Sequence, residues 1–183
     1  MKTIKLLAAF LLANLVFVSC SDDDSSPEPV NEEETITTMT VTLQPTGGTA
    51  ITLQSRDLDG DGPNAPVVTV SGNLAASTTY SGSIVLLNET ETPAEDITEE
   101  VEAEDEEHQF FFVTTGNIAS VDYTDQDGDN NPVGLTFDLT TGDAGNATLA
   151  ITLRHEPKKP NDGTLSDAGG ETDFTETFNL TVE

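Results

Sequence analysis

Apolar and polar residues alternate along most of the chain beyond about residue 38. In the segment 133–140, valine, leucine and phenylalanine occupy every second position, and glycine, threonine and aspartate lie between them. This period of two is typical of a strand with one buried face. It predicts nine strands, at about 39–43, 50–55, 66–71, 80–88, 109–114, 118–124, 133–140, 146–155 and 174–182, with Glu176 as the one break in the last strand.

Nine short strands separated by glycine, asparagine and aspartate turns predict an all-β fold. We expect an antiparallel, immunoglobulin-like sandwich of about 7–9 strands. Two runs, 84–87 and 110–113, are apolar on both faces. They are expected to be central strands or to have one face covered by a helix.

One segment favours that helix. Thr92 and Glu95 have the spacing of a capping box, with Pro93 at the first helical position. Ile97 and Val101 follow four residues apart, on one helical face. We expect one short helix from about residue 93 to about residue 105.

The chain begins with features of an export signal. Lys2 and Lys5 precede an apolar stretch, 6–18, which is interrupted only by Asn14. As a helix this stretch would measure roughly 20 Å, too short for a bilayer core of about 30 Å. A basic head, a short apolar run and a small residue before a cleavage site predict a signal peptide over residues 1–19.

The junction after this stretch resembles the lipobox of bacterial lipoproteins, with Ser19 followed by Cys20. Phe17 stands where that family usually has leucine. The next four residues, Ser-Asp-Asp-Asp, resemble the surface-export signal of lipoproteins of the Bacteroidota. The resemblance implies that Cys20 is lipidated and that the protein is anchored to the outer membrane, facing the cell surface. The alternative is a cleaved secretory peptide followed by a free thiol or an intermolecular disulfide.

Longer stretches strengthen the likeness. "DLDGDGPNAPVVTVSGNL", "GSIVLLNETETPAEDITEEVE" and "LRHEPKK" are similar to parts of small acidic lipoproteins of the Bacteroidota. Relatives in that group are often labelled as type 1 periplasmic binding fold proteins. That fold is a two-lobed α/β architecture, which the strand pattern does not predict. The label suggests at most a ligand-binding accessory to an outer-membrane uptake system.

Composition divides the mature chain into two parts. Residues 20–34 are acidic and contain proline and serine, so we expect a disordered tether before a β-sandwich domain at 35–183. The formal charge is −28, and loss of the two signal lysines would leave four bases against 34 acids, a charge of −30. Such a charge repels nucleic acid and attracts cations. Adaptation to salt explains the same composition.

Two loops have the form D-x-D-G-D. Their aspartates resemble the start of the calcium loops in EF-hand and dockerin-like modules, but Val68 and Thr136 stand where the bidentate glutamate would be. A calcium ion would therefore need further ligands from elsewhere. The alternative is an Asp-Gly hairpin turn. The candidate ligands are Asp57, Asp59 and Asp61 in the first loop and Asp125, Asp127 and Asp129 in the second.

The chain has two histidines, each beside a glutamate. His108 follows Glu107 at the start of one predicted strand, and His155 precedes Glu156 at the end of another. If these strands are antiparallel neighbours, the two imidazoles meet and form, with carboxylates, a site for Zn²⁺ or Cu²⁺. The pair could also bind haem iron axially. The alternative is two unrelated histidines at strand ends.

No nucleophile motif, phosphate-binding loop or recognisable carboxylate pair indicates an enzyme. We therefore expect a lipid-anchored, surface-facing module that binds a divalent cation or a metal complex, and that serves an outer-membrane transporter. The alternative is a structural, adhesion or glycan-interaction module with calcium-stiffened loops.

Overall fold

The computed structural model describes residues 34–60 and 62–183. The signal peptide, Cys20, most of the predicted tether and Asp61 lie outside these residues. The described chain forms ten strands and two short helices. They are β1 (Thr38–Pro45), β2 (Ile51–Arg56), β3 (Val67–Val70), β4 (Thr79–Asn88), β5 (Glu95–Asp96), α1 (Ile97–Ala103), β6 (His108–Gly116), β7 (Ile118–Tyr123), β8 (Thr136–Thr141), β9 (Gly145–His155), α2 (Leu165–Ala168) and β10 (Glu171–Val182).

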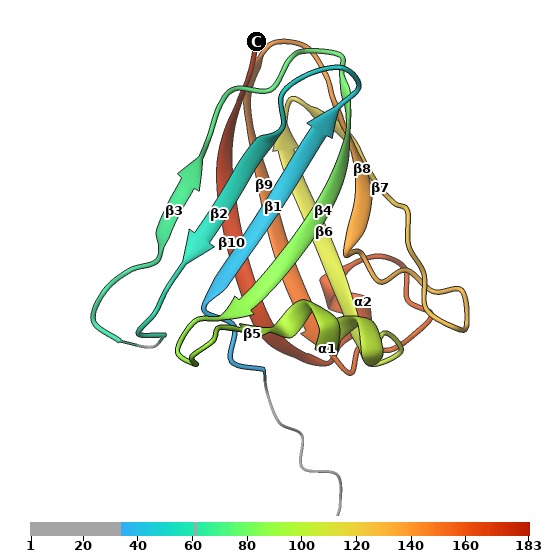
Figure 1. The fold of residues 1–183 in the computed structure, drawn as a ribbon. Helices are drawn as coiled ribbons and strands as arrows, with labels where there is room; N and C mark the ends of the chain where they lie inside the picture. The colour runs from blue at the N-terminus through green and yellow to red at the C-terminus, as the bar shows by residue number, and fades with distance from the viewer. Residues whose placement is uncertain (1–33, 61) are drawn as a thin grey trace, which may run out of the picture. The chain divides into compact units, whose positions relative to one another are not determined.

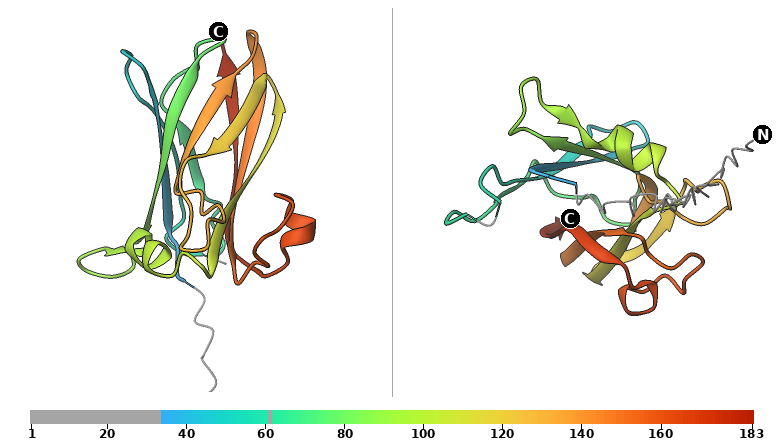
Figure 2. Two further views of the ribbon diagram at one scale, coloured as in Figure 1. Left: turned by 90° about the vertical axis from the view of Figure 1, so that its right-hand side faces the viewer. Right: turned by 90° about the horizontal axis from the view of Figure 1, so that it is seen from below.

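The strands form two sheets that pack face to face (Figure 1, Figure 2). The larger sheet has the order β3-β2-β1-β4-β8-β7, with the two-residue β5 added to β4. The smaller sheet has the order β10-β9-β6. Every pairing between these strands is antiparallel. The predicted all-β antiparallel sandwich is therefore confirmed, and all nine predicted strands are present.

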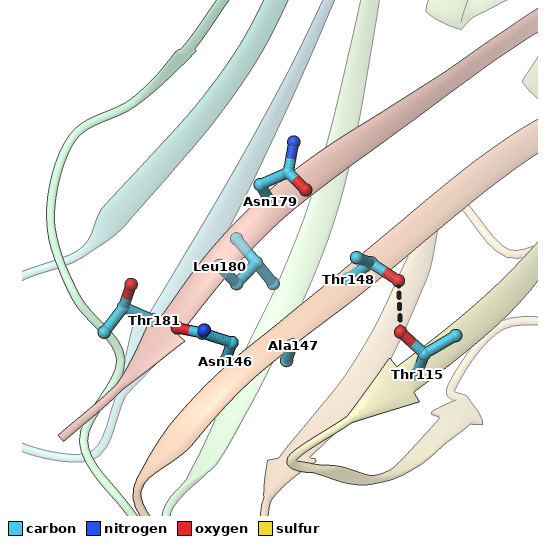
Figure 3. A pocket seen from close by; sticks show the side chains of 7 residues that line it. All are labelled: Thr115, Asn146, Ala147, Thr148, Asn179, Leu180 and Thr181. Carbon is cyan, nitrogen blue, oxygen red and sulfur yellow. Dashed lines mark hydrogen bonds between the residues drawn. The ribbon is translucent and has the colours of Figure 1, made fainter.

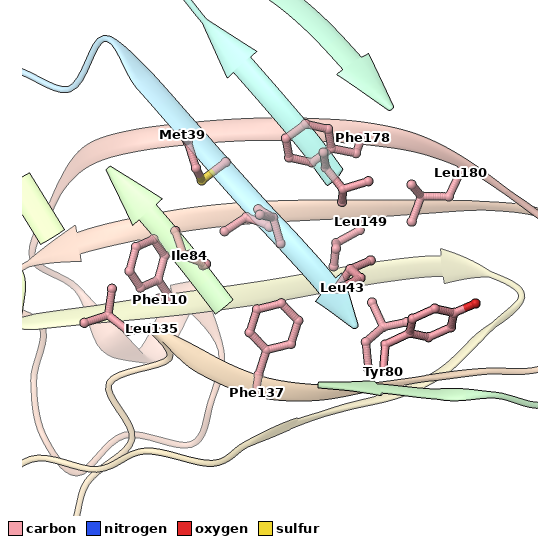
Figure 4. Close-up of a cluster of buried hydrophobic side chains, with 14 of the residues drawn as sticks. Met39, Leu43, Tyr80, Ile84, Phe110, Leu135, Phe137, Leu149, Phe178 and Leu180 are labelled. Atoms are coloured by element: carbon pink, nitrogen blue, oxygen red, sulfur yellow. The ribbon is translucent and has the colours of Figure 1, made fainter. Parts of the chain in front are cut away.

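One continuous core lies between the sheets (Figure 4). Met39 and Leu43 reach it from the larger sheet, and Phe110, Leu149 and Phe178 reach it from the smaller one. The alternation seen in the sequence produces this layer, because inward residues of a strand recur every second position. In β4, for example, every even-numbered residue from Tyr80 to Asn88 is buried.

The two doubly apolar runs differ in their surroundings. The run in β4 is central, since β4 lies between β1 and β8. The run in β6 is not, because β6 is an edge of the smaller sheet. The segment between β9 and β10 lies over the start of β6, where the Asn161 amide donates a hydrogen bond to Gln109. This segment, which contains α2, thus contacts the face of β6 on which Phe111 is also buried.

The helix prediction is correct in position and wrong in its start. Helix α1 begins at Ile97, and its N-cap is Asp96, whose carboxylate accepts a hydrogen bond from the Thr98 backbone N–H. The predicted cap at Thr92 fails because Glu95 and Asp96 pair with β4 as strand β5. Ile97 and Val101, which share one face of the predicted helix, are buried in the core. Helix α2, four residues long and capped by Thr164, was not predicted.

Candidate metal centre

His108 and His155 lie side by side. They are the first residue of β6 and the last residue of β9, and the antiparallel ladder pairs them directly. His108 Nε2 lies 3.0 Å from His155 Nδ1, and the rings are nearly perpendicular, with an interplanar angle of 84°. The strands are thus antiparallel neighbours, which the metal hypothesis required.

Strand geometry turns both imidazoles inward. Two positions further along the ladder, Phe110 pairs with Leu153, and both residues belong to the core. Because side chains two residues apart share a face, His108 and His155 continue the same inward row. The start of β6 and the end of β9, which carry them, lie at the end of the sandwich where α1 lies (Figure 1).

Two carboxylates complete the cluster. Glu34, four residues before β1, places Oε1 3.0 Å from His108 Nε2 and Oε2 3.7 Å from His155 Nδ1. Asp173 lies at the irregularity where the β9–β10 register shifts, and its Oδ2 is 3.8 Å from His108 Nε2. One ligand atom from each of the four residues lies within 4.8 Å of all the others.

The cluster is enclosed. The side chains of His108 and Asp173 are 0% exposed, and those of Glu34 and His155 are 6% and 7% exposed. Ionisable groups are rarely buried together without a proton or an ion between them. Glu34 Oε2 accepts no hydrogen bond from any described residue. The centre therefore has an unused buried ligand atom.

The surroundings of His108 orient its ring and raise its pKa. Its Nδ1–H donates to the Glu104 carbonyl at 3.2 Å, which leaves Nε2 facing the cluster. Burial opposes the charged imidazole, but the hydrogen bond and charge of Glu34, the Glu104 carbonyl and Asp173 together raise the pKa of His108. Burial likewise opposes the Glu34 carboxylate, yet contact with His108 holds the pKa of Glu34 below its usual value.

The four residues could together hold a metal ion that takes nitrogen and oxygen ligands. Zinc binds imidazole nitrogen at about 2.0–2.1 Å, so two tetrahedral nitrogen ligands stand roughly 3.3 Å apart. The two histidine nitrogens lie 3.0 Å apart before any adjustment. Calcium takes oxygen ligands, so nitrogen donors favour zinc or copper here. The short separation leaves no room for a porphyrin between the imidazoles, so the arrangement does not favour axial haem binding.

Sequence reasoning missed both carboxylates. The composition predicts Glu34 as the last residue of the tether, but its burial against the histidines places it with the folded domain. Asp173 precedes the clear alternation of β10, and the irregularity that turns it towards His108 leaves no recognisable spacing in the sequence. Glu156, which the sequence predicts as a ligand, lies outside the four-residue centre. It forms a second cluster with Glu107 and His155.

The first aspartate loop is a surface turn in its described part. Asp59 is exposed, and its Oδ2 accepts a 2.7 Å hydrogen bond from the Asn64 side chain. The Asp59 backbone N–H donates to Asp57 Oδ1 at 3.2 Å. These contacts within the loop are those of an Asp-Gly turn. Asp61 lies outside the described residues.

The second aspartate loop uses its carboxylates internally. Asp125 accepts hydrogen bonds from the backbone N–H groups of Gly134 and Thr136. Asp127 is buried and accepts the Lys159 ammonium at 3.1 Å, so a protein cation already contacts it. Asp129 is exposed. The contacts of this loop support the turn alternative over a calcium site.

A shallow hollow of about 380 Å³ lies at the opposite end of the smaller sheet (Figure 3). Its lining is uncharged and includes Thr115, Asn146, Thr148, Asn179 and Thr181. Thr115 and Thr148 share a hydrogen bond of 2.7 Å. In a chain with 34 acidic residues, this is a neutral polar patch.

No protein-family model, curated protein or solved structure matches the chain. The resemblance to lipoproteins of the Bacteroidota accordingly stays a prediction. Among residues 34–60 and 62–183, neither helix has the length and apolar character needed to cross a bilayer.

Proposed function

We propose that this protein is a lipid-anchored, surface-facing module that binds a divalent transition-metal ion without transforming it. The observation that carries the proposal is the convergence of His108 Nε2 and His155 Nδ1, 3.0 Å apart, on the buried Glu34 and Asp173 carboxylates. Two imidazoles and two carboxylates form a donor set that suits zinc first and copper second.

The enclosure favours an ion that is held for a long time. Four protein ligands fill a tetrahedral shell, as in structural zinc sites, whereas catalytic sites keep one position open for water or substrate. His108, His155 and Asp173 come from the smaller sheet, and Glu34 leads into β1 of the larger one. A bound ion would therefore connect the two sheets. Transfer to an outer-membrane transporter would require this end of the sandwich to open.

Metal analysis of the purified full chain tests the proposal. We expect about one zinc ion per chain by elemental analysis, with an affinity measured against a chromogenic chelator. His155→Asn and Asp173→Asn should each weaken zinc binding by at least about 100-fold, since direct ligands matter more than their supporting groups. Glu99→Gln, an exposed change on α1, is the control and should bind as the parent does. A parent chain that binds no zinc or copper would overturn the proposal.

The anchor needs a separate experiment. Cys20→Ala removes the only thiol of the chain. Stable anchoring requires more than one acyl chain, and the lipobox resemblance implies that Cys20 carries these chains. Loss of this residue should therefore release the protein from the membrane fraction. A variant that fractionates with the outer membrane as firmly as the parent would contradict the anchor.

The uncharged hollow favours a second candidate function, binding of a neutral glycan. The Asn146 and Asn179 side chains make no hydrogen bond to other described residues, so their amides can pair with sugar hydroxyls. Calorimetric titration with neutral oligosaccharides tests this, with Asn179→Ala as the variant. Binding that is lost in Asn179→Ala and kept in His155→Asn would favour an interaction module over a metal module.

A further inference from the structure

A second cluster adjoins the buried centre and shares a residue with it. One ligand atom each of Glu107, His155 and Glu156 lies within 4.8 Å of the others. Both glutamates are exposed, whereas His155 is buried. The Glu156 backbone N–H donates to the Glu107 carbonyl at 2.6 Å, so the two acidic residues extend the β6–β9 ladder just beyond the histidines. The shared His155 connects an exposed set of donors to an enclosed one.

The enclosed centre poses a kinetic problem for any ion that binds there. With side-chain exposures of 0–7%, none of its four residues offers an open path to solvent. A hydrated divalent ion must lose its water before it is enclosed, and loss of hydration without replacement ligands is costly. A stepwise exchange of water for protein ligands avoids a bare ion.

We propose that Glu107 and Glu156 form a loading site for the same divalent metal ion, which passes to the buried centre through His155. This inference depends on the proposed metal-binding function. The two exposed carboxylates can hold an ion that keeps part of its water, as oxygen ligands do for weakly bound cations. An imidazole has two ring nitrogens, so His155 can contact an ion on either side of its ring.

Charge around the two glutamates supports capture of a cation. Glu107 ends the acidic run 89–107, which contains α1, and the chain as a whole carries −28. A field of one sign raises the local concentration of counter-ions and the rate at which they associate. That general attraction belongs to the whole surface, whereas transfer through His155 needs Glu107 and Glu156 in particular. The two contributions can therefore be separated by experiment.

The test compares rates of zinc uptake by the full chain at fixed ionic strength. The double variant Glu107→Gln/Glu156→Gln should bind zinc about tenfold more slowly in stopped-flow competition with a chromogenic chelator. Its equilibrium affinity should stay unchanged, because the buried ligands remain. Release into excess chelator should slow by the same factor, since an ion leaves by the path through which it loads.

The control is Glu99→Gln/Glu102→Gln on α1, which removes the same charge from exposed residues of the same acidic run. This control should load at nearly the parental rate. Equal slowing in both variants would show general attraction alone and would overturn the inference. So would an unchanged rate in Glu107→Gln/Glu156→Gln, or a loss of equilibrium affinity that equals the loss of rate. A parent chain that binds no metal would instead defeat the proposed function itself.

Discussion

Ser55 of β2 donates a hydrogen bond of 2.7 Å to Glu176 of β10, and so connects the two sheets. Glu176 is the one residue that breaks the apolar alternation of the last strand. Its inward carboxylate meets the buried Ser55 hydroxyl, and its other oxygen accepts from the Thr177 backbone N–H. The break in the pattern is therefore a polar contact between the layers.

Removing the acceptor should destabilise the fold. Glu176→Ala leaves the buried Ser55 hydroxyl without its partner, at an expected cost of about 1–3 kcal/mol in the free energy of unfolding. Glu176→Gln keeps an acceptor oxygen and should cost less. Urea denaturation of the three proteins measures the difference. An equal effect of both substitutions would show that charge, not the hydrogen bond, matters at this position.

Zinc should stabilise the protein against heat. An ion that binds only the folded state adds about 2.7 kcal/mol when its concentration is 100 times the dissociation constant. We therefore expect the melting temperature of the metal-free chain to rise on addition of zinc and to fall again with EDTA. His155→Asn should abolish this shift, whereas Glu99→Gln should retain it. A melting temperature that changes with neither zinc nor EDTA would contradict binding at a site between the sheets.

The fold could be predicted far better than the site. Strand positions follow from alternation wherever a strand lines the buried layer. β3 is the exception, because Val67 and Val68 are exposed and none of its four residues is buried. The proximity of His108 and His155 depends on the antiparallel pairing of β6 with β9. That pairing depends on the whole sheet and leaves no local signal. Glu34 joins the centre from the segment before β1, and Asp173 joins it at a local irregularity in β10. Neither position has a recognisable spacing in the sequence.

Acid should weaken the contact between Asp127 and Lys159. Burial opposes the charged carboxylate, but hydrogen bonds from Asn131 and Lys159 outweigh it and lower the pKa of Asp127. A lowered pKa in the folded state gives stability that is present above the unfolded pKa of about 4 and is lost as the pH falls through the folded pKa. The melting temperature of Asp127→Asn should thus be lower than that of the parent at neutral pH. The two melting temperatures should become equal in acid. Thermal melts across pH 2–7 measure this, and a constant difference would contradict it.

Glu34 should be the ligand whose loss is best tolerated. The other three donors are held by one three-stranded sheet, whereas Glu34 lies on the segment that leads into β1. Glu34→Gln removes one carboxylate charge and keeps the size of the side chain, so three ligands remain in place. We expect zinc affinity to fall about 10- to 100-fold, less than for Asp173→Asn, with little change in the stability of the metal-free chain. Competition with a chromogenic chelator measures both affinities. If Glu34→Gln loses as much affinity as Asp173→Asn, the two carboxylates contribute equally and the segment before β1 is as firmly placed as the sheet.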